Sequence, residues 1–71
     1  MEIYKIKSSD KEYIGIILSI HAETTSARTV FGDYIHEVVC YTVKIIPKDD
    51  TDIIIDNIII HSLNDIVPYE E

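Results

Sequence analysis

The sequence is poor in the residues that build helices, disulfides and flexible loops. Its 71 residues include no Trp and no Gln, two Leu, two Ala, two Gly, two Pro and a single Cys. So few helix-forming residues exclude a helical bundle or a coiled coil. One cysteine cannot close an intramolecular disulfide, on which small secreted domains commonly depend. Since there is also no leader-like segment and no apolar run of membrane-spanning length, we expect a cytoplasmic protein without membrane contact.

What the sequence does contain is isoleucine. Sixteen Ile, five Val and five Thr make it rich in residues that favour strands. The hydrophobic fraction of 46 % is enough for a core, and the length allows one domain, residues 1–71. A core this small leaves little room for a catalytic pocket. We therefore expect a protein that works by binding, with no enzymatic activity and no cofactor.

Alternating apolar residues predict the first strands. Residues 2–7 form a short strand with Tyr4 and Ile6 on one face, and residues 12–21 form a second strand. Gly15 within that strand indicates a bulge or a close backbone approach. The polar residues 22–33 predict a long loop, followed by a third strand at 34–46. The expected faces are Ile14, Ile16, Leu18 and Ile20 in the second strand and Ile35, Val39, Tyr41, Val43 and Ile45 in the third.

The C-terminal third predicts a further strand and a helical turn. Residues 52–61 form either a hairpin that turns at Asp56-Asn57 or one bent strand, which the missing glycine favours. Ser62 followed by Asp65 matches a capping box, so a short helical turn is expected near 62–66, with an extended segment after it. The order of elements resembles that of SH3-like small barrels. The resemblance implies an all-β fold, either such a barrel or a strongly bent antiparallel sheet of four to five strands.

The net charge of −7 is concentrated near the C-terminus. Residues 1–48 carry six acidic and six basic side chains, whereas residues 49–71 carry seven acidic ones and no Lys or Arg. This sign disfavours direct binding to nucleic acid and to anionic membranes, and it favours a basic protein partner. Solubility alone would also explain it. The candidate partner-binding residues are Asp49, Asp50, Asp52, Asp56, Asp65, Glu70 and Glu71.

The leading functional hypothesis is a small acidic protein that binds a larger, basic macromolecular partner. Its sharpest version is a phage-type inhibitor that mimics nucleic acid and blocks a host nucleic-acid-binding or defence enzyme, as anti-CRISPR and anti-restriction proteins do. The 22–33 loop is a second candidate for recognition, with Arg28 and Phe31 as its anchors. The sequence does not decide between the loop and the acidic end.

The isoleucine triplets 53–55 and 58–60 support an alternative function. A strand that is apolar at every position needs cover on both faces. Either the rest of the chain folds over it, or a second copy or another partner does. In the alternative function the protein is a self-assembling structural or accessory subunit, a homodimer in the simplest case. Its homomeric interface would be formed by Ile53, Ile55, Ile58, Ile59 and Ile60.

The residues with reactive or metal-binding side chains form no recognisable motif. His36 and Cys40 are placed on one strand face but four residues apart, too far to share a tetrahedral metal. His21 and His61 have no supporting spacing, so no metal site is expected. Cys40 is interpreted as a small core residue, with a nucleophile assisted by His36 or His61 as the alternative.

Overall fold

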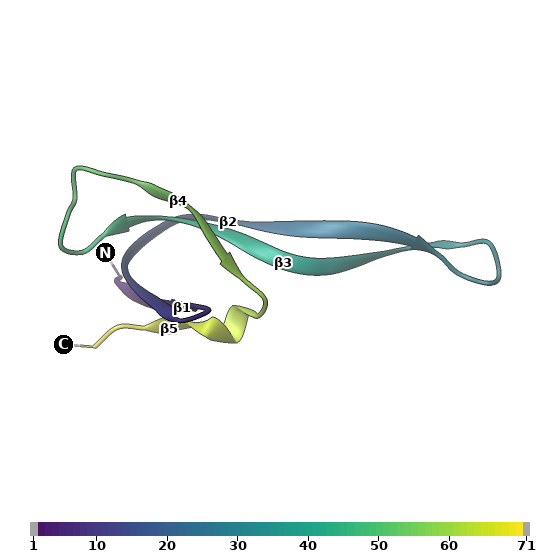
Figure 1. Cartoon of the computed structure of the whole chain (residues 1–71), viewed down its shortest axis with the longest axis horizontal. Helices are drawn as coiled ribbons and strands as arrows, with labels where there is room; N and C mark the ends of the chain where they lie inside the picture. Colours follow the sequence, from purple (N-terminus) through teal and green to yellow (C-terminus); the bar gives the residue numbers. More distant parts are fainter. Residues whose placement is uncertain (1, 71) are drawn as a thin grey trace.

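The computed structural model describes residues 2–70, and most of them belong to one antiparallel sheet (Figure 1). The expectation of an all-β fold with a strongly bent sheet is confirmed. The sheet order is β4-β3-β2-β1-β5, and no helix in residues 2–70 is long and apolar enough to cross a membrane. The elements are β1 (Tyr4–Ser8), β2 (Lys11–Arg28), β3 (Tyr34–Pro47), β4 (Ile55–Ile60), the 3-10 turn η1 (Leu63–Asp65) and β5 (Ile66–Pro68).

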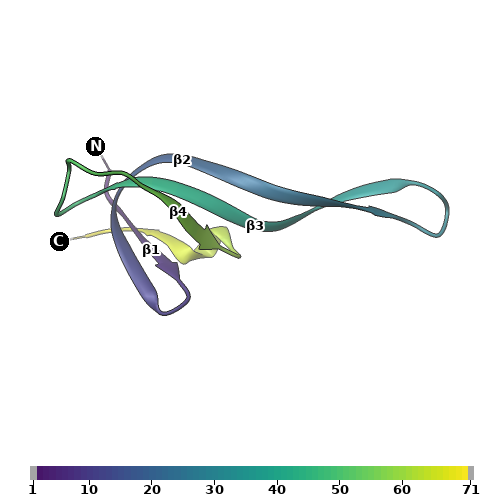
Figure 2. The ribbon, with the colours of Figure 1, turned by 45° about the horizontal axis from the view of Figure 1, so that its top comes forward.

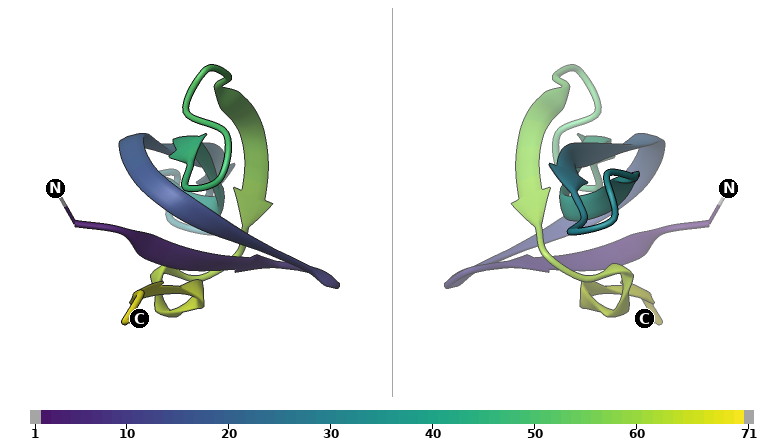
Figure 3. Two further views of the ribbon diagram at one scale, coloured as in Figure 1. Left: turned by 90° about the vertical axis from the view of Figure 1, so that its left-hand side faces the viewer. Right: turned by 90° about the vertical axis from the view of Figure 1, so that its right-hand side faces the viewer.

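The sheet curls strongly but does not close into a barrel. The strand order ends at β4 on one side and at β5 on the other, with no backbone pairing between β1 and β4 in the described residues. The curl nevertheless brings β4 across β1, as the end-on views show (Figure 3). The hydroxyl of Ser8 donates a hydrogen bond to the carbonyl oxygen of Ile59 at 2.5 Å. A side-chain bond thus links β1 and β4, which share no backbone pairing in the described residues.

Gly15 lies where β2 passes closest to the end of β3. A Cβ atom at this position would overlap the carbonyl oxygen of Ile46 and lie 2.9 Å from its carbonyl carbon. The predicted close backbone approach is therefore confirmed, whereas the shifts in β2–β3 register occur elsewhere, between Ile17 and Ser19 and between Glu23 and Thr24. Only glycine fits, because the obstacle is backbone and cannot rotate away.

These register shifts overturn the predicted faces of β2 and β3. Ile20 pairs with Val43 and Ile17 pairs with Ile45, so Ile17 and Ile20 share a face across the extra residue Leu18. Ile14 and Ile16 consequently lie on the opposite face from Ile20, contrary to the prediction. A bulge adds one residue to one strand, and this reverses the alternation beyond it.

The same effect occurs in β3, where the extra residue is Val39. Glu23 pairs with Cys40 and Thr24 pairs with Val38, so no β2 residue lies opposite Val39. Beyond the bulge, Ile35 lies on the opposite face of the sheet from Tyr41, Val43 and Ile45. The predicted common face of these residues is therefore wrong.

The predicted loop 22–33 is also wrong over most of its length. Residues 22–28 continue β2 and pair with β3, and only the connection between Arg28 and Tyr34 is a turn. Thr24 and Thr25 favour strands, and the polar side chains around them suit a ribbon that meets water on both faces. The turn is compact: the amide of Thr29 donates to the carbonyl of Asp33 at 2.7 Å, and Gly32 adopts a positive φ of 88°.

The C-terminal predictions are confirmed in their main features. Residues Ile55–Ile60 form one strand, and Asp56-Asn57 lies within it and does not form a hairpin turn. The helical turn follows at Leu63–Asp65, where the Ser62 hydroxyl accepts a hydrogen bond from the Asn64 amide at 3.1 Å.

The buried core occupies only one end of the molecule. It consists of five side chains, from three strands: Ile6, Val43, Ile45, Ile58 and Ile60. Tyr13, Ile17, Tyr41, Ile55 and Ile66 pack around them. The rest of the β2–β3 hairpin projects from this body as a two-stranded ribbon, which we call the arm and define as residues 21–40 (Figure 2). The molecule therefore measures 51 × 23 × 21 Å.

Candidate binding surfaces

The arm has no core of its own. Within residues 21–40, every residue except Thr29 and Cys40 is exposed, on both faces of the ribbon. The exposed side chains include large apolar ones: Val30, Phe31, Tyr34, Ile35, Val38 and Val39. Leu18 and Ile20 extend this apolar surface to the base of the arm. So many exposed large apolar side chains on one projecting segment are typical of a site of interaction.

The tip of the arm presents its two most exposed apolar residues on an ordered turn. Val30 is 96 % exposed and Phe31 is 88 % exposed. The Thr29 hydroxyl accepts hydrogen bonds from the amides of Phe31 and Asp33, both at 3.3 Å. Beside the turn, the guanidinium of Arg28 lies 5.7 Å from the centre of the Tyr34 ring. The predicted anchors Arg28 and Phe31 are therefore both at the tip, on a preformed surface.

Both long edges of the arm carry unpaired backbone. β1 pairs with β2 only as far as Gly15, and β4 pairs with β3 only from Tyr41 onward. In the part of the chain that the structure describes, the outer edge of β2 from Ile16 to Arg28 and that of β3 from Tyr34 to Cys40 have no neighbouring strand. Neither edge contains a Lys or Pro, the residues that commonly block strand addition.

The acidic residues are exposed, but they do not form one cluster. Asp49, Asp50 and Asp52 lie in the connection from β3 to β4, Asp56 follows early in β4, and Glu70 lies in the C-terminal segment. The β3–β4 connection and the C-terminus both lie at the end of the molecule away from the arm tip (Figure 1). Asp65 is separate and partly buried in η1. Glu71 lies outside the described residues.

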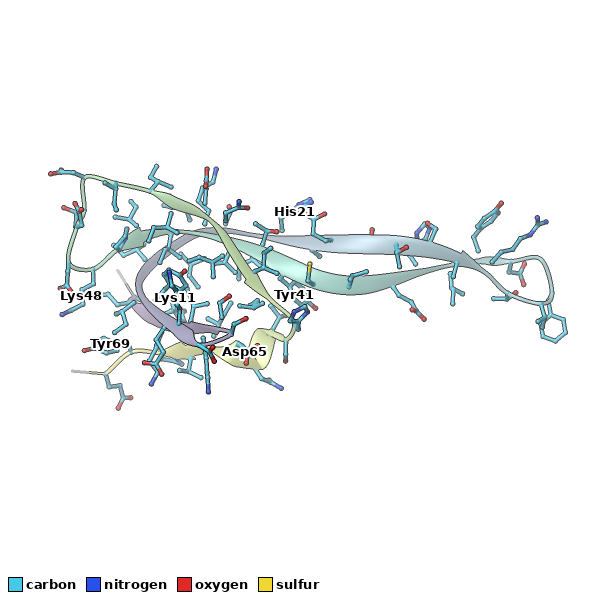
Figure 4. All side chains as sticks on the ribbon, in the orientation of Figure 1. Lys11, His21, Tyr41, Lys48, Asp65 and Tyr69 are labelled. Carbon is cyan, nitrogen blue, oxygen red and sulfur yellow. The ribbon has the colours of Figure 1, made fainter. Side chains whose placement is uncertain are left out.

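A basic side chain lies within this acidic end. The ammonium group of Lys48 lies 5.6 Å from the centre of the Tyr69 ring, so it connects the β3–β4 connection with the C-terminal segment (Figure 4). Its positive charge weakens the negative potential that the neighbouring carboxylates produce.

The isoleucine segment divides between core and surface. Ile58 and Ile60 are buried and Ile55 is partly buried, so the folded chain itself covers these three. Ile59 is 48 % exposed and Ile53 is 46 % exposed. The surface that a second copy could reach also includes Ile54, the most exposed of the six at 59 %, which the prediction omitted.

The residues considered for metal binding or catalysis are not brought together. His36 pairs through its Nδ1 with the Ser26 hydroxyl at 3.0 Å, while Cys40 pairs with Glu23 in the register. The bulge at Val39 places His36 and Cys40 on opposite faces, which corrects their predicted common face and excludes His36 as a base for the thiol. No group of three His, Cys, Asp or Glu side chains suited to a metal occurs within residues 2–70.

The phenol of Tyr4, at the start of β1, has a perturbed pKa. The Tyr4 hydroxyl donates a hydrogen bond to Glu2 at 2.5 Å. This bond and the negative charge of Glu2 raise the pKa of Tyr4 above its ordinary value. Tyr4 is partly exposed, and its bond to Glu2 is local to the N-terminal segment.

The free edges of the arm are the feature that sequence reasoning missed. The signal was present, since residues 20–29 contain three Thr, favoured in strands, and no Gly or Pro. The arm tip and the acidic end lie at opposite ends of the molecule (Figure 1). Comparisons with protein-family models, with curated proteins and with solved structures find no match to this chain.

Proposed function

We propose that this chain is a non-enzymatic binding protein whose arm docks onto another polypeptide chain. The observation that carries the proposal is the projecting arm, which exposes apolar side chains on both faces. A two-stranded ribbon alone is marginally stable in water, and a third strand or a packed face stabilises it. The free, half-buried thiol of Cys40 supports a reducing compartment such as the cytoplasm.

The tip is the part of the arm best suited to anchor a partner. A rigid aromatic side chain loses little conformational entropy on binding, and aromatic residues dominate the energetics of many interfaces. Phe31 meets this description because hydrogen bonds to Thr29 hold its turn. The free edges beside it can add a strand from the partner.

Capture from a native lysate tests this function. The bait is the tagged chain, and the variant is Phe31→Ser. Ile54→Ser is the matched control, because it makes an apolar-to-Ser change at an exposed position in the body. We expect the Phe31 variant to lose the captured polypeptide at least about tenfold, since a buried aromatic anchor contributes more than about 1.4 kcal/mol. Equal loss with both variants, or with neither, contradicts the proposal.

A second candidate function uses the acidic end. The exposure of Asp49, Asp50 and Asp52 on one short connection supports a surface that mimics nucleic acid and inhibits a basic enzyme, as a phage-type inhibitor would. Replacing the three by Asn should weaken capture of a basic partner and reduce its sensitivity to salt. Unchanged capture at low salt would remove this candidate and leave the arm as the binding surface.

A further inference from the structure

The elongated molecule exposes more surface than a compact chain of the same length. Its radius of gyration is 15.1 Å, whereas a compact chain of this length has a radius of about 11 Å. Its accessible surface is 5471 Å², whereas a compact protein of 8.2 kDa exposes about 4,500 Å². The excess, roughly 1,000 Å², is similar to the roughly 800 Å² that each partner buries in an interface of standard size.

The outer edge of β2 can pair with a copy of itself. A two-fold axis perpendicular to the sheet makes two identical strands antiparallel and keeps each side chain on the same face of the sheet. Because side chains alternate between faces, facing residues of the two copies have numbers that are equal or differ by an even amount. Around Thr25 the facing pairs are Thr25 with Thr25, Thr24 with Ser26, and Glu23 with Ala27. No like charges face each other, and Thr–Thr and Thr–Ser pairs are favourable across strands.

The corresponding edge of β3 is less suitable for self-pairing. A two-fold axis at its centre, Glu37, would place two carboxylates directly opposite each other, which is destabilising. An axis at His36 would place Ile35 opposite Glu37 of the other copy. The β3 edge therefore meets unfavourable pairs at its central registers. It is also the shorter of the two free edges, residues 34–40 against residues 16–28 of β2, so we take the β2 edge as the pairing edge.

We propose that the arm binds a second copy of this chain, paired antiparallel along the outer edge of β2 about a two-fold axis at Thr25. This inference rests on the proposed function of the arm. The two ribbons would form one four-stranded sheet, in which the unpaired backbone of β2 is satisfied. The tip of each arm would reach the base of the other, where Leu18 and Ile20 are exposed.

Disulfide trapping tests the pairing in the full chain. In a Cys40→Ser background, Thr25→Cys places one thiol at the proposed axis, and Glu37→Cys is the matched control. Thr25 and Glu37 are direct cross-strand partners, so the two variants place a thiol on the same face of the ribbon, one on each strand of the arm. Glu37→Cys also removes the carboxylate that disfavours pairing along β3, which makes it a stringent control. Across the axis the two Cβ atoms at position 25 would be about 5 Å apart. Those at position 37 would be separated by three strand spacings, about 14 Å.

We expect mild oxidation to give a covalent dimer from Thr25→Cys at least about ten times faster than from Glu37→Cys. Sedimentation equilibrium of the unmodified chain should give twice the monomer mass of 8.2 kDa. A monomer at all concentrations, or faster trapping at position 37, would overturn the inference. In either case, loss of lysate capture by Phe31→Ser would show that the arm still binds another protein, so failure of the dimer and failure of the proposed function are distinguishable.

Discussion

The body and the arm share β2 and β3 but differ in how those two strands are covered. In the body, β2 and β3 bury Val43 and Ile45 beneath β1 and β4, and the curl of the sheet supplies the cover. In the arm, the same strands continue with both faces in water. Strand propensity and cross-strand hydrogen bonds persist along the whole hairpin, while hydrophobic burial stops near Tyr41. The comparison shows that the stability of the fold is local to the body.

The largest effect that separates the two regions is expected at the glycines. Gly15→Val should unfold the body or destabilise it by more than about 3 kcal/mol, because the new side chain overlaps backbone that cannot move away. Gly32→Ala, at the positive φ of the arm turn, should cost only about 1 kcal/mol. Urea unfolding followed by circular dichroism measures both. Similar midpoints for the two variants would show that the body does not depend on the close approach.

Neighbouring positions on β4 give the next effect. Ile58→Ala should cost about 2–5 kcal/mol, because the side chain is 2 % exposed and its removal leaves a cavity. Ile59→Ala should cost less than about 1 kcal/mol, because half of that side chain already meets water. The same unfolding assay measures the difference. Equal losses would mean that a second molecule covers Ile59.

Shortening the arm should have a smaller effect on the body. Deleting residues 24–27 and 35–38 removes four cross-strand pairs and retains both the turn and the alternation of faces. We expect the unfolding free energy of the monomer to change by less than about 1 kcal/mol, since no core residue is lost. The shortened chain should be a monomer in sedimentation equilibrium, because the proposed pairing site around Thr25 has been removed. A large loss of monomer stability would refute the division into body and arm.

The smallest expected effect concerns Tyr4 in the body. Because its pKa is raised, the folded state holds the phenolic proton more tightly, and this contribution to stability is present below the ordinary Tyr value and lost at higher pH. Glu2→Gln should lower the Tyr4 pKa toward the ordinary value. Difference absorbance against Tyr4→Phe follows the titration. An unchanged titration would show that Glu2 is not its partner in solution.

The body could be predicted from sequence better than the arm, for a physical reason. The strand-forming alternation, the helical turn after Ser62 and the close approach at Gly15 follow from local signals, and the structure confirms the elements that these signals predict. The faces of Ile16 and Ile35 were assigned wrongly because a bulge leaves no mark in the alternation of a strand. The polar residues 22–28 predict a loop, because polar stretches are common in irregular segments. Polar residues also suit a ribbon that is exposed on both faces, and the sequence alone does not separate the two cases. The unpaired edges depend on where β1 and β4 end, which no local pattern specifies.

Because of the extra residue Val39, the side chains at the two ends of β3 are oriented independently of each other. From Tyr41 onward, packing against the core fixes which side chains point inward. From Tyr34 to Val38, the turn at Thr29 fixes the pairing, and the bulge absorbs the mismatch between the two. Substitutions in the arm, or insertions of two residues in each of its strands, can therefore change the exposed side chains of the arm. The residues that point into the core of the body keep their orientation. The bulge thus separates a frame that packing holds fixed from a surface that can change without disturbing it.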